Sequence, residues 1–320
     1  MVKSKSKPVR LTGKKRSLWR ELKEEKFFYI IAIPAIAMLI LFNYVPMAGI
    51  YLAFEKYSYK GGLFGSEFVG LDNFKTFFAN WKYVLRASRN SLVLSVGGSV
   101  FGITLNVLVA CILGEIRNER YRKTVQAVTI FPHFLSWIVV GVIADMLLND
   151  KTGIVNNIIQ SLGGDPIAWS SSPMYWPTII ILFGLWKGFG YGSIVYYATL
   201  TSFDPGLYEA AELDGASRFQ RIMRITIPML MPTISLMFLL GIGGVLAGGG
   251  IDQIMGLTKN SSMLYETTQT LPMYVYNATM GKTDYGMSAT VSLYQSIVGC
   301  ALVLLSNFLA KKMDPDYALF

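Results

Sequence analysis

Six long apolar stretches, separated by shorter polar segments, dominate the pattern of this 320-residue chain. They lie at about residues 27–50, 90–114, 125–148, 174–200, 226–248 and 288–310. Each is long enough for a membrane-spanning helix, which needs roughly 20 apolar residues. The pattern therefore predicts an all-α integral membrane protein, in which residues 27–310 form one domain of six transmembrane helices.

Basic residues gather in segments that would share one side of the membrane. The tail at residues 1–26 carries ten of the 29 Lys and Arg residues, and its part from 17 to 26 has the pattern of an amphipathic helix at a membrane surface. More basic residues follow the second and fourth stretches and begin the tail at 311–320. The positive-inside rule places these segments, and therefore both termini, in the cytoplasm.

The composition leaves little chain for a soluble domain, since 52% of the residues are apolar and only 15% are charged. The net charge of +9 follows from topology and contact with lipid headgroups, because the basic residues flank the apolar stretches. Basic residues placed in this way do not form one face, so no nucleic-acid partner is expected. Cys111 and Cys300 fall inside apolar stretches and are predicted to be small buried residues without a disulfide.

Residues for catalysis or metal binding are lacking. His133 is the only histidine, so a histidine-based metal cluster is excluded. Gly281, Lys282 and Thr283 resemble the end of a phosphate-binding loop, but Tyr276 stands where that loop requires glycine. We therefore expect no enzymatic activity and no cofactor bound by this chain.

Glycine marks the fourth and fifth stretches. Gly184, Gly188 and Gly192 recur at four-residue steps and predict a stripe along which another helix backbone packs closely. The fifth stretch begins after Pro228 and Pro232 and ends in "GGVLAGGGIDQ". Because glycine weakens a helix by about 1 kcal/mol per residue relative to alanine, its outer end is expected to unwind.

Three polar residues lie near the outer ends of the third and fifth stretches. Asp145, near the outer end of the third stretch, is expected to reach the membrane interface. Asp252 and Gln253 follow the fifth stretch and are expected to face water, with a contact to a pathway or a partner as the alternative.

One charge lies deep in an apolar stretch. Lys187 is about thirteen residues into the fourth, ~20 Å from its start. A charge at the middle of a helix costs ~2.5–3.5 kcal/mol, so Lys187 should face a cavity or a partner. Tyr191 lies on nearly the same face, and the pair would suit an acidic sugar, with the ring stacked on Tyr191. An internal ion pair, or a contact between subunits, is the alternative. Trp186 points elsewhere and is a weaker candidate for the pathway.

The polar loop at 201–228 reads "TSFDPGLYEAAELDGASRFQRIMRITIP". Asp204 and Pro205 predict a capped helix start, and Gly215 predicts a turn before a second helix near Ser217. A simple connector with cytoplasmic arginines would explain these features. It would not explain the small face of Ala210 and Ala211 or the glycine at the break, which a docking surface would need.

The spacing of this loop resembles the EAA motif of permease subunits of binding-protein-dependent ABC importers. That motif reads Glu-Ala-Ala, three residues, Gly, nine residues, Ile, any residue, Leu, Pro. The matching residues here are Glu209, Ala210, Ala211, Gly215, Ile225 and Pro228, while Ile227 replaces the leucine.

The resemblance implies that the loop is a coupling helix seated in a cleft of an ATP-binding subunit. The residues implied to dock are Glu209, Ala210, Ala211, Asp214, Gly215, Ala216 and Phe219. It also implies a second permease subunit in a heterodimer, two ATP-binding subunits that hold the ATP and Mg²⁺, and an extracytoplasmic solute-binding protein. The expected location is the bacterial cytoplasmic (inner) membrane.

The cargo is less constrained. "FVGLDNF", the loop and the Lys-Lys end resemble the subgroup for oligo- and polysaccharides, which includes alginate importers. A permease for phosphate-type anions or amino acids stays open, as does a membrane scaffold without transport. A secondary transporter driven by an ion gradient is the main alternative. Such a protein is expected to have internal repeats and several carboxylates inside the membrane, whereas Asp145 is the only acidic residue well inside an apolar stretch here.

Overall fold

The computed structural model describes residues 26–244, 246, 250–314 and 318. The tail at 1–25, and with it nearly all of the predicted amphipathic helix, lies outside the described residues. Five described helical segments are long and apolar enough to cross a membrane, at Ile30–Phe54, Trp81–Glu115, Pro173–Leu200, Arg218–Ile242 and Tyr285–Lys312. A bent pair, Glu119–Phe134 with Trp137–Leu148, is the sixth if it counts as one span. The predicted all-α membrane fold is confirmed.

The chain divides into two compact units, Met1–Tyr51 and Leu52–Phe320. The described part of the first contains α2 (Lys26–Leu39), the π-helical turn η1 (Ile40–Tyr44) and most of the 3₁₀ segment η2 (Val45–Phe54). Its apolar side chains, among them Ile31, Leu41 and Phe42, are exposed. A helix that is apolar on all sides is expected where lipid or other subunits surround it.

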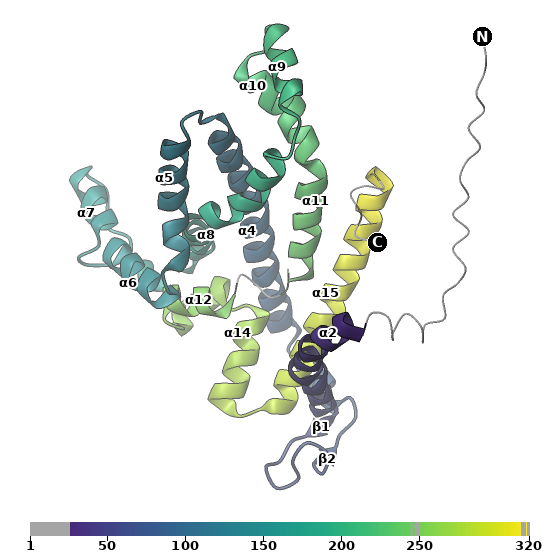
Figure 1. Ribbon diagram of the computed structural model, residues 1–320. Helices are drawn as coiled ribbons and strands as arrows, with labels where there is room; N and C mark the ends of the chain where they lie inside the picture. Colours follow the sequence, from purple (N-terminus) through teal and green to yellow (C-terminus); the bar gives the residue numbers. More distant parts are fainter. Residues whose placement is uncertain (1–25, 245, 247–249, 315–317, 319–320) are drawn as a thin grey trace. The chain divides into compact units, whose positions relative to one another are not determined.

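The second unit is built on the pairing of α4 (Trp81–Glu115) with α8 (Trp176–Leu200). The long helices α11 (Ile227–Gly243) and α15 (Tyr285–Met313) pack against one another. Figure 1 shows α9 (Pro205–Leu213) and α10 (Arg218–Arg221) together at one end of α4 and α11, with α14 (Leu271–Tyr276) beyond the other end of α4.

Short elements join these helices. They are β1 (Glu55–Lys56) paired antiparallel with β2 (Glu67–Phe68), α3 (Asp72–Ala79), α7 (Ile154–Ser161), η4 (Trp169–Ser171), η5 (Pro173–Tyr175), η6 (Ile222–Thr226), α12 (Ile251–Thr258), η8 (Ser262–Leu264), α13 (Tyr265–Thr268) and η9 (Asn277–Gly281). The strand pair is the only sheet among the described residues.

The third apolar stretch is not one straight helix, which corrects the prediction for residues 125–148. It forms α5 (Glu119–Ile130), the 3₁₀ turn η3 (Phe131–Phe134) and α6 (Trp137–Leu148), with a bend of 95°. Pro132 opens the turn, and Ser136 starts the new helix by accepting a hydrogen bond from the Val139 N–H at 3.2 Å. The apolar stretch at 125–148 did not reveal this break, because the residues on both sides of Pro132 within it are mostly apolar.

The fifth stretch ends early, as its glycines predicted. Helix α11 ends at Gly243, and Gly250, with φ of 86°, precedes the separate helix α12. Gln253 on α12 is buried, so the expectation that it faces water is wrong.

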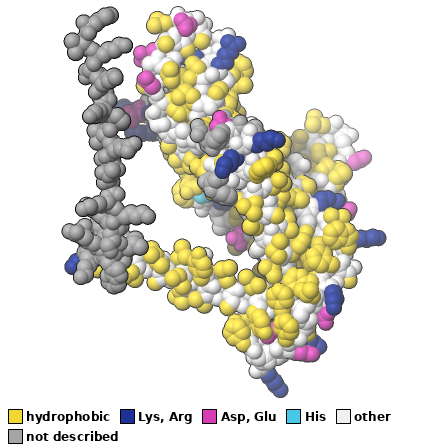
Figure 2. Space-filling model, turned by 90° about the vertical axis from the view of Figure 1, so that its right-hand side faces the viewer, with side chains coloured by type: hydrophobic (Ala, Val, Ile, Leu, Met, Phe, Trp, Pro, Cys, Tyr) yellow, Lys and Arg dark blue, Asp and Glu magenta, His cyan; other side chains and the backbone are white. Residues whose placement is uncertain are grey.

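Hydrophobic side chains cover much of the face shown in Figure 2. The two cysteines divide between interior and surface. Cys111 is buried with Val107, Ala110 and Tyr196, but Cys300 is exposed on α15. The prediction for Cys300 is therefore wrong, because an apolar residue of a spanning helix can face outward, where lipid or another subunit covers it.

Candidate functional site

The predicted coupling loop folds as two short helices around a glycine turn. The Asp204 carboxylate accepts a hydrogen bond from the Gly206 N–H at 2.9 Å and starts α9. Gly215 has φ of 80°, a conformation that L side chains rarely adopt. Ser217 and Gln220 then form a reciprocal capping box that starts α10. Local sequence signals thus place both helices and the turn.

The docking residues implied by the motif gather on this loop. Glu209, Ala210, Asp214, Gly215 and Phe219 are exposed, and Ala211 and Ala216 are half-buried. Two apolar side chains also point outward, since Phe219 is 70% exposed and Leu213 is 90% exposed. Leu213 was not among the docking residues named from the sequence. The signal that was available is its position between Glu212 and Asp214, which marks it as an apolar residue at the end of an acidic helix. Exposed apolar residues beside a small-residue face are typical of a surface that a partner covers.

Ion pairs join the loop to α4 and hold its two helices together. Arg218 Nε and Arg221 Nη2 lie 3.7 and 4.0 Å from Glu115 Oε2 at the end of α4. Within the loop, Arg221 Nη1 lies 2.8 Å from Glu212 Oε2. The Arg221 side chain is only 11% exposed, although Glu212 is open to solvent.

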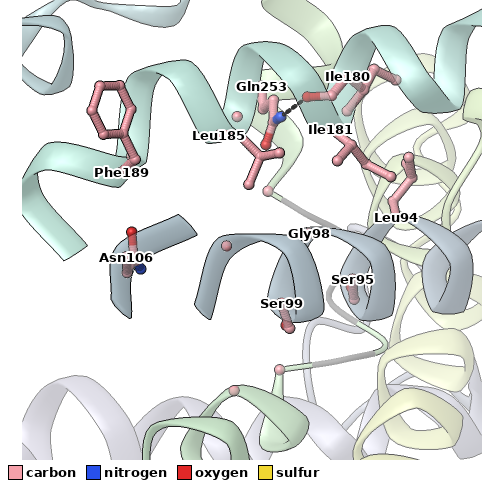
Figure 3. Close-up of a pocket in the computed structure, with 16 residues that line it drawn as sticks. Leu94, Ser95, Gly98, Ser99, Asn106, Ile180, Ile181, Leu185, Phe189 and Gln253 are labelled. Atoms are coloured by element: carbon pink, nitrogen blue, oxygen red, sulfur yellow. Dashed lines mark hydrogen bonds between the residues drawn. The ribbon is translucent and has the colours of Figure 1, made fainter. Parts of the chain in front are cut away.

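An open cavity of about 470 Å³ lies between α4 and α8, and residues at the end of α11 and the start of α12 also line it. In Figure 3, Leu185 of α8 points toward the segment of α4 that carries Ser95, Ser99 and Asn106. The polar lining consists of Ser95, Ser99, Asn106 and Gln253, and glycines of both helices widen the space.

Two polar atoms of this lining have no partner. Ser95 Oγ and Asn106 Oδ1 are buried and form no hydrogen bond with the described residues. By contrast, the Gln253 side chain donates to the Ile180 carbonyl at 2.7 Å. An unsatisfied buried group costs about 1–3 kcal/mol, so a rearrangement that gives these two atoms a donor would stabilise the lining.

The glycine stripe of α8 contacts polar side chains and not, as its spacing predicted, the backbone of another helix. A Cβ on Gly184 would meet the Gln253 side chain, and one on Gly192 would meet the Asn106 side chain. Gly188 borders the cavity. The close approach of another helix backbone is made instead at Gly190, where a Cβ would collide with the Thr129 carbonyl of α5. The stripe thus accommodates polar side chains of the cavity lining.

The three candidate pathway residues lie beside the break in the third stretch or on the surface. Lys187 Nζ donates to the His133 carbonyl at 2.6 Å and lies 5.4 Å from the centroid of the Trp137 ring. The Tyr191 ring stacks on His133 at a centroid distance of 4.1 Å. Trp186 contacts the edge of Phe183 and is partly exposed.

Lys187 and Tyr191 are thus brought together, as predicted, but against η3 and not within the lining of the cavity. Breaking the helix leaves the His133 carbonyl without an intrahelical donor, and the ammonium of Lys187 supplies one. This contact was beyond sequence reasoning, because the two residues are 54 positions apart. A role in the pathway stays a prediction.

No group of three or more His, Cys, Asp or Glu side chains in the described part of the chain could hold a metal ion. Asp145, the carboxylate inside the third stretch, pairs with Lys259 of the chain after α12 at 3.2 Å.

Comparisons with known proteins agree with this geometry. Residues 102–317 match the family described as binding-protein-dependent transport system inner membrane component. The chain is 34% identical to the protein LplB of Bacillus subtilis (strain 168), over 98% of both. It is 33% identical to the polygalacturonan/rhamnogalacturonan transport system permease protein YteP of the same organism, over 95% of this chain and 93% of YteP.

A solved structure matches the fold. It is the crystal structure of a bacterial alginate ABC transporter in complex with alginate pentasaccharide-bound periplasmic protein, one chain of which superimposes with a TM-score of 0.82 and 31% identity, over 93% of this chain and 98% of that one. The family match spans well over half of the chain and includes the coupling loop. This chain therefore belongs to the inner membrane components of binding-protein-dependent transport systems, the non-catalytic permease subunits of ABC importers, whose ATPase is a separate subunit.

Proposed function

We propose that this chain forms one half of the translocation pathway for an oligo- or polysaccharide, with acidic chains such as alginate as the favoured cargo. The observation that carries the proposal is the cavity between α4 and α8, whose lining includes the hydroxyl of Ser99 and the amides of Asn106 and Gln253, side chains of the kind that bond to sugar hydroxyls. The similarity to a polygalacturonan/rhamnogalacturonan permease and to an alginate transporter supports the acidic class.

The proposed assembly follows from the number of docking loops. One chain offers one coupling loop, whereas the two ATP-binding subunits of an importer need two. A second permease chain therefore completes the pore in a heterodimer, and ATP with Mg²⁺ stays on the ATP-binding subunits. A solute-binding protein delivers the cargo from outside. In this arrangement the loop and both termini face the cytoplasm of a bacterium, and the chain lies in its inner membrane.

Transport in proteoliposomes tests this function. The complex of this chain with its copurified partners, supplied with its solute-binding protein, should take up labelled oligogalacturonate or alginate oligosaccharide when ATP is provided on the cytoplasmic side. Vanadate, which arrests ABC-type ATPases, should stop uptake, and an uncoupler should leave it unchanged. Uptake that follows the ion gradient instead would support a secondary transporter, a reading already weakened by the pairing of Asp145 with Lys259.

The substitution Lys187→Met tests whether the half-buried Lys187 ammonium discriminates between cargoes. Uptake of acidic oligosaccharide is expected to fall about tenfold, because a hydrogen bond to a charged group contributes about 1.5–3 kcal/mol, while uptake of a methyl-esterified oligogalacturonate should fall much less. Lys187→Arg keeps the charge and is the matched control. Equal loss with both cargoes would mean that Lys187 acts only by holding the His133 carbonyl.

A further inference from the structure

The first turns of α4 carry three cations on one helical face. Lys82, Arg86 and Arg89 are spaced at four and three residues, so at 100° per residue they lie within about 60° of one another. Val93, Val96 and Val100 continue the same face by the same spacing. These valines are 47%, 45% and 46% exposed, so the whole face is open along the helix.

The cations surround a hollow of about 360 Å³ that Leu85 and Glu266 also line. The Arg89 guanidinium donates to Asn90 Oδ1 at 3.1 Å and to the Glu266 carbonyl at 3.2 Å, which fixes its direction. Arg86 lies 5.0 Å from the centroid of the Tyr83 ring. In the part of the chain that the structure describes, no carboxylate forms an ion pair with any of the three, although Glu266 also lines the hollow. Two guanidinium groups are therefore held in place and keep their charge available.

The position of this face in the membrane is unusual. Glu115, at the other end of α4, lies beside Arg218 of the coupling loop. Lys82 is therefore on the opposite side, which is the outer side when the loop is cytoplasmic. The positive-inside rule gives no reason for three cations there. Trp81 is 54% exposed beside them, and tryptophan is enriched where helices cross the membrane interface.

The order of side chains fits one class of ligand. From Arg89 to Val100 the helix rises ~16 Å, which is about the thickness of one leaflet's hydrocarbon layer. Cations at the interface followed by an apolar strip match a phosphate headgroup followed by an acyl chain. A sugar carboxylate could meet the cations, but the valines offer nothing to its hydroxyl groups.

We propose that this face binds an anionic phospholipid of the outer leaflet, with its phosphate on Lys82, Arg86 and Arg89 and an acyl chain along Val93, Val96 and Val100. Arginine suits phosphate because its N–H groups donate in pairs to two oxygens. The site is separate from the cavity between α4 and α8 and does not depend on the identity of the cargo.

Native mass spectrometry of the full chain, with phosphatidylglycerol or phosphatidylcholine titrated into the detergent, tests the proposal. Each cation near a membrane surface changes anionic lipid binding about fivefold. The triple variant Lys82→Gln, Arg86→Gln, Arg89→Gln is therefore expected to bind phosphatidylglycerol on the order of a hundredfold more weakly and to lose its preference over phosphatidylcholine. Lys82→Gln alone removes no hydrogen bond or ion pair among the described residues, and it should weaken binding about fivefold.

A variant with three exposed cations replaced near the cytoplasmic end, Arg120→Gln, Lys311→Gln, Lys312→Gln, is the matched control and should keep the site. Unchanged lipid preference in both the single and the triple variant would overturn the proposal. Displacement of phosphatidylglycerol by oligogalacturonate would reassign the face to the cargo. Loss of a copurified permease subunit from the triple variant, with lipid binding intact, would reassign it to a protein contact.

Discussion

Replacing Gly215 with Asp is expected to abolish the stimulation of ATP hydrolysis by loaded solute-binding protein, while the chain still inserts into the membrane. Gly215 has φ of 80°, and space is open around the Cβ position on the surface implied to dock. The new side chain therefore starts in open space and projects from the surface that the EAA motif implies to dock on the ATP-binding subunit. Stimulated ATPase activity of the reconstituted complex is the measurement, and a fall to the basal rate is the expected result.

Gly163→Asp is the matched control. Gly163 has φ of 84° and equally open surroundings, but it follows α7 and lies outside the coupling loop. Both variants carry the same backbone strain, about 1–2 kcal/mol for a left-handed residue. Only the one in the coupling loop should lose stimulation. If Gly215→Asp keeps its stimulated rate, the loop does not couple ATP hydrolysis to transport.

Gly190→Val is expected to damage the fold more than any other single change considered. A Cβ at this position would overlap the Thr129 carbonyl and the Ile130 nitrogen, which are backbone atoms that no rotamer change can move. Overpacking of this kind costs about 1–3 kcal/mol and often more. Thermal unfolding of the purified chain in detergent should show a transition lower by several degrees and a reduced yield of folded protein.

The neighbouring substitution Gly188→Val supplies the comparison on the same helix. No atom lies within 4 Å of a Cβ at Gly188, which borders the cavity. Its unfolding transition should stay near that of the unchanged protein, even if transport suffers. Equal destabilisation by the two valines would show that α5 does not approach α8 closely at Gly190.

The sequence predicted the features that depend on local order. The number of membrane stretches follows from apolar length, and the caps at Asp204 and Ser217 follow from residue types that bind nearby N–H groups. The docking face implied by the EAA motif stays a prediction, and its residues could be named because all of them lie in one short segment.

Features that depend on distant contacts were not predictable in this way. Helix α4 begins at Trp81 and not near 90, because a helix that leaves the membrane no longer has an apolar signature. Gln253 is buried because it donates to Ile180, which is 73 positions away. The network of Arg221, Glu212 and Glu115 joins segments that no local pattern connects.

The most direct test of the central claim is affinity purification of this chain from its native membrane in mild detergent, followed by identification of the proteins that accompany it. An ATP-binding subunit and a second permease chain should be recovered with the unchanged protein. Both the ATP-binding subunit and its activity should be lost with the double variant Glu209→Ala, Gly215→Asp. A chain that purifies alone, or one that keeps the ATPase despite both substitutions, would contradict the account of the loop as the coupling element.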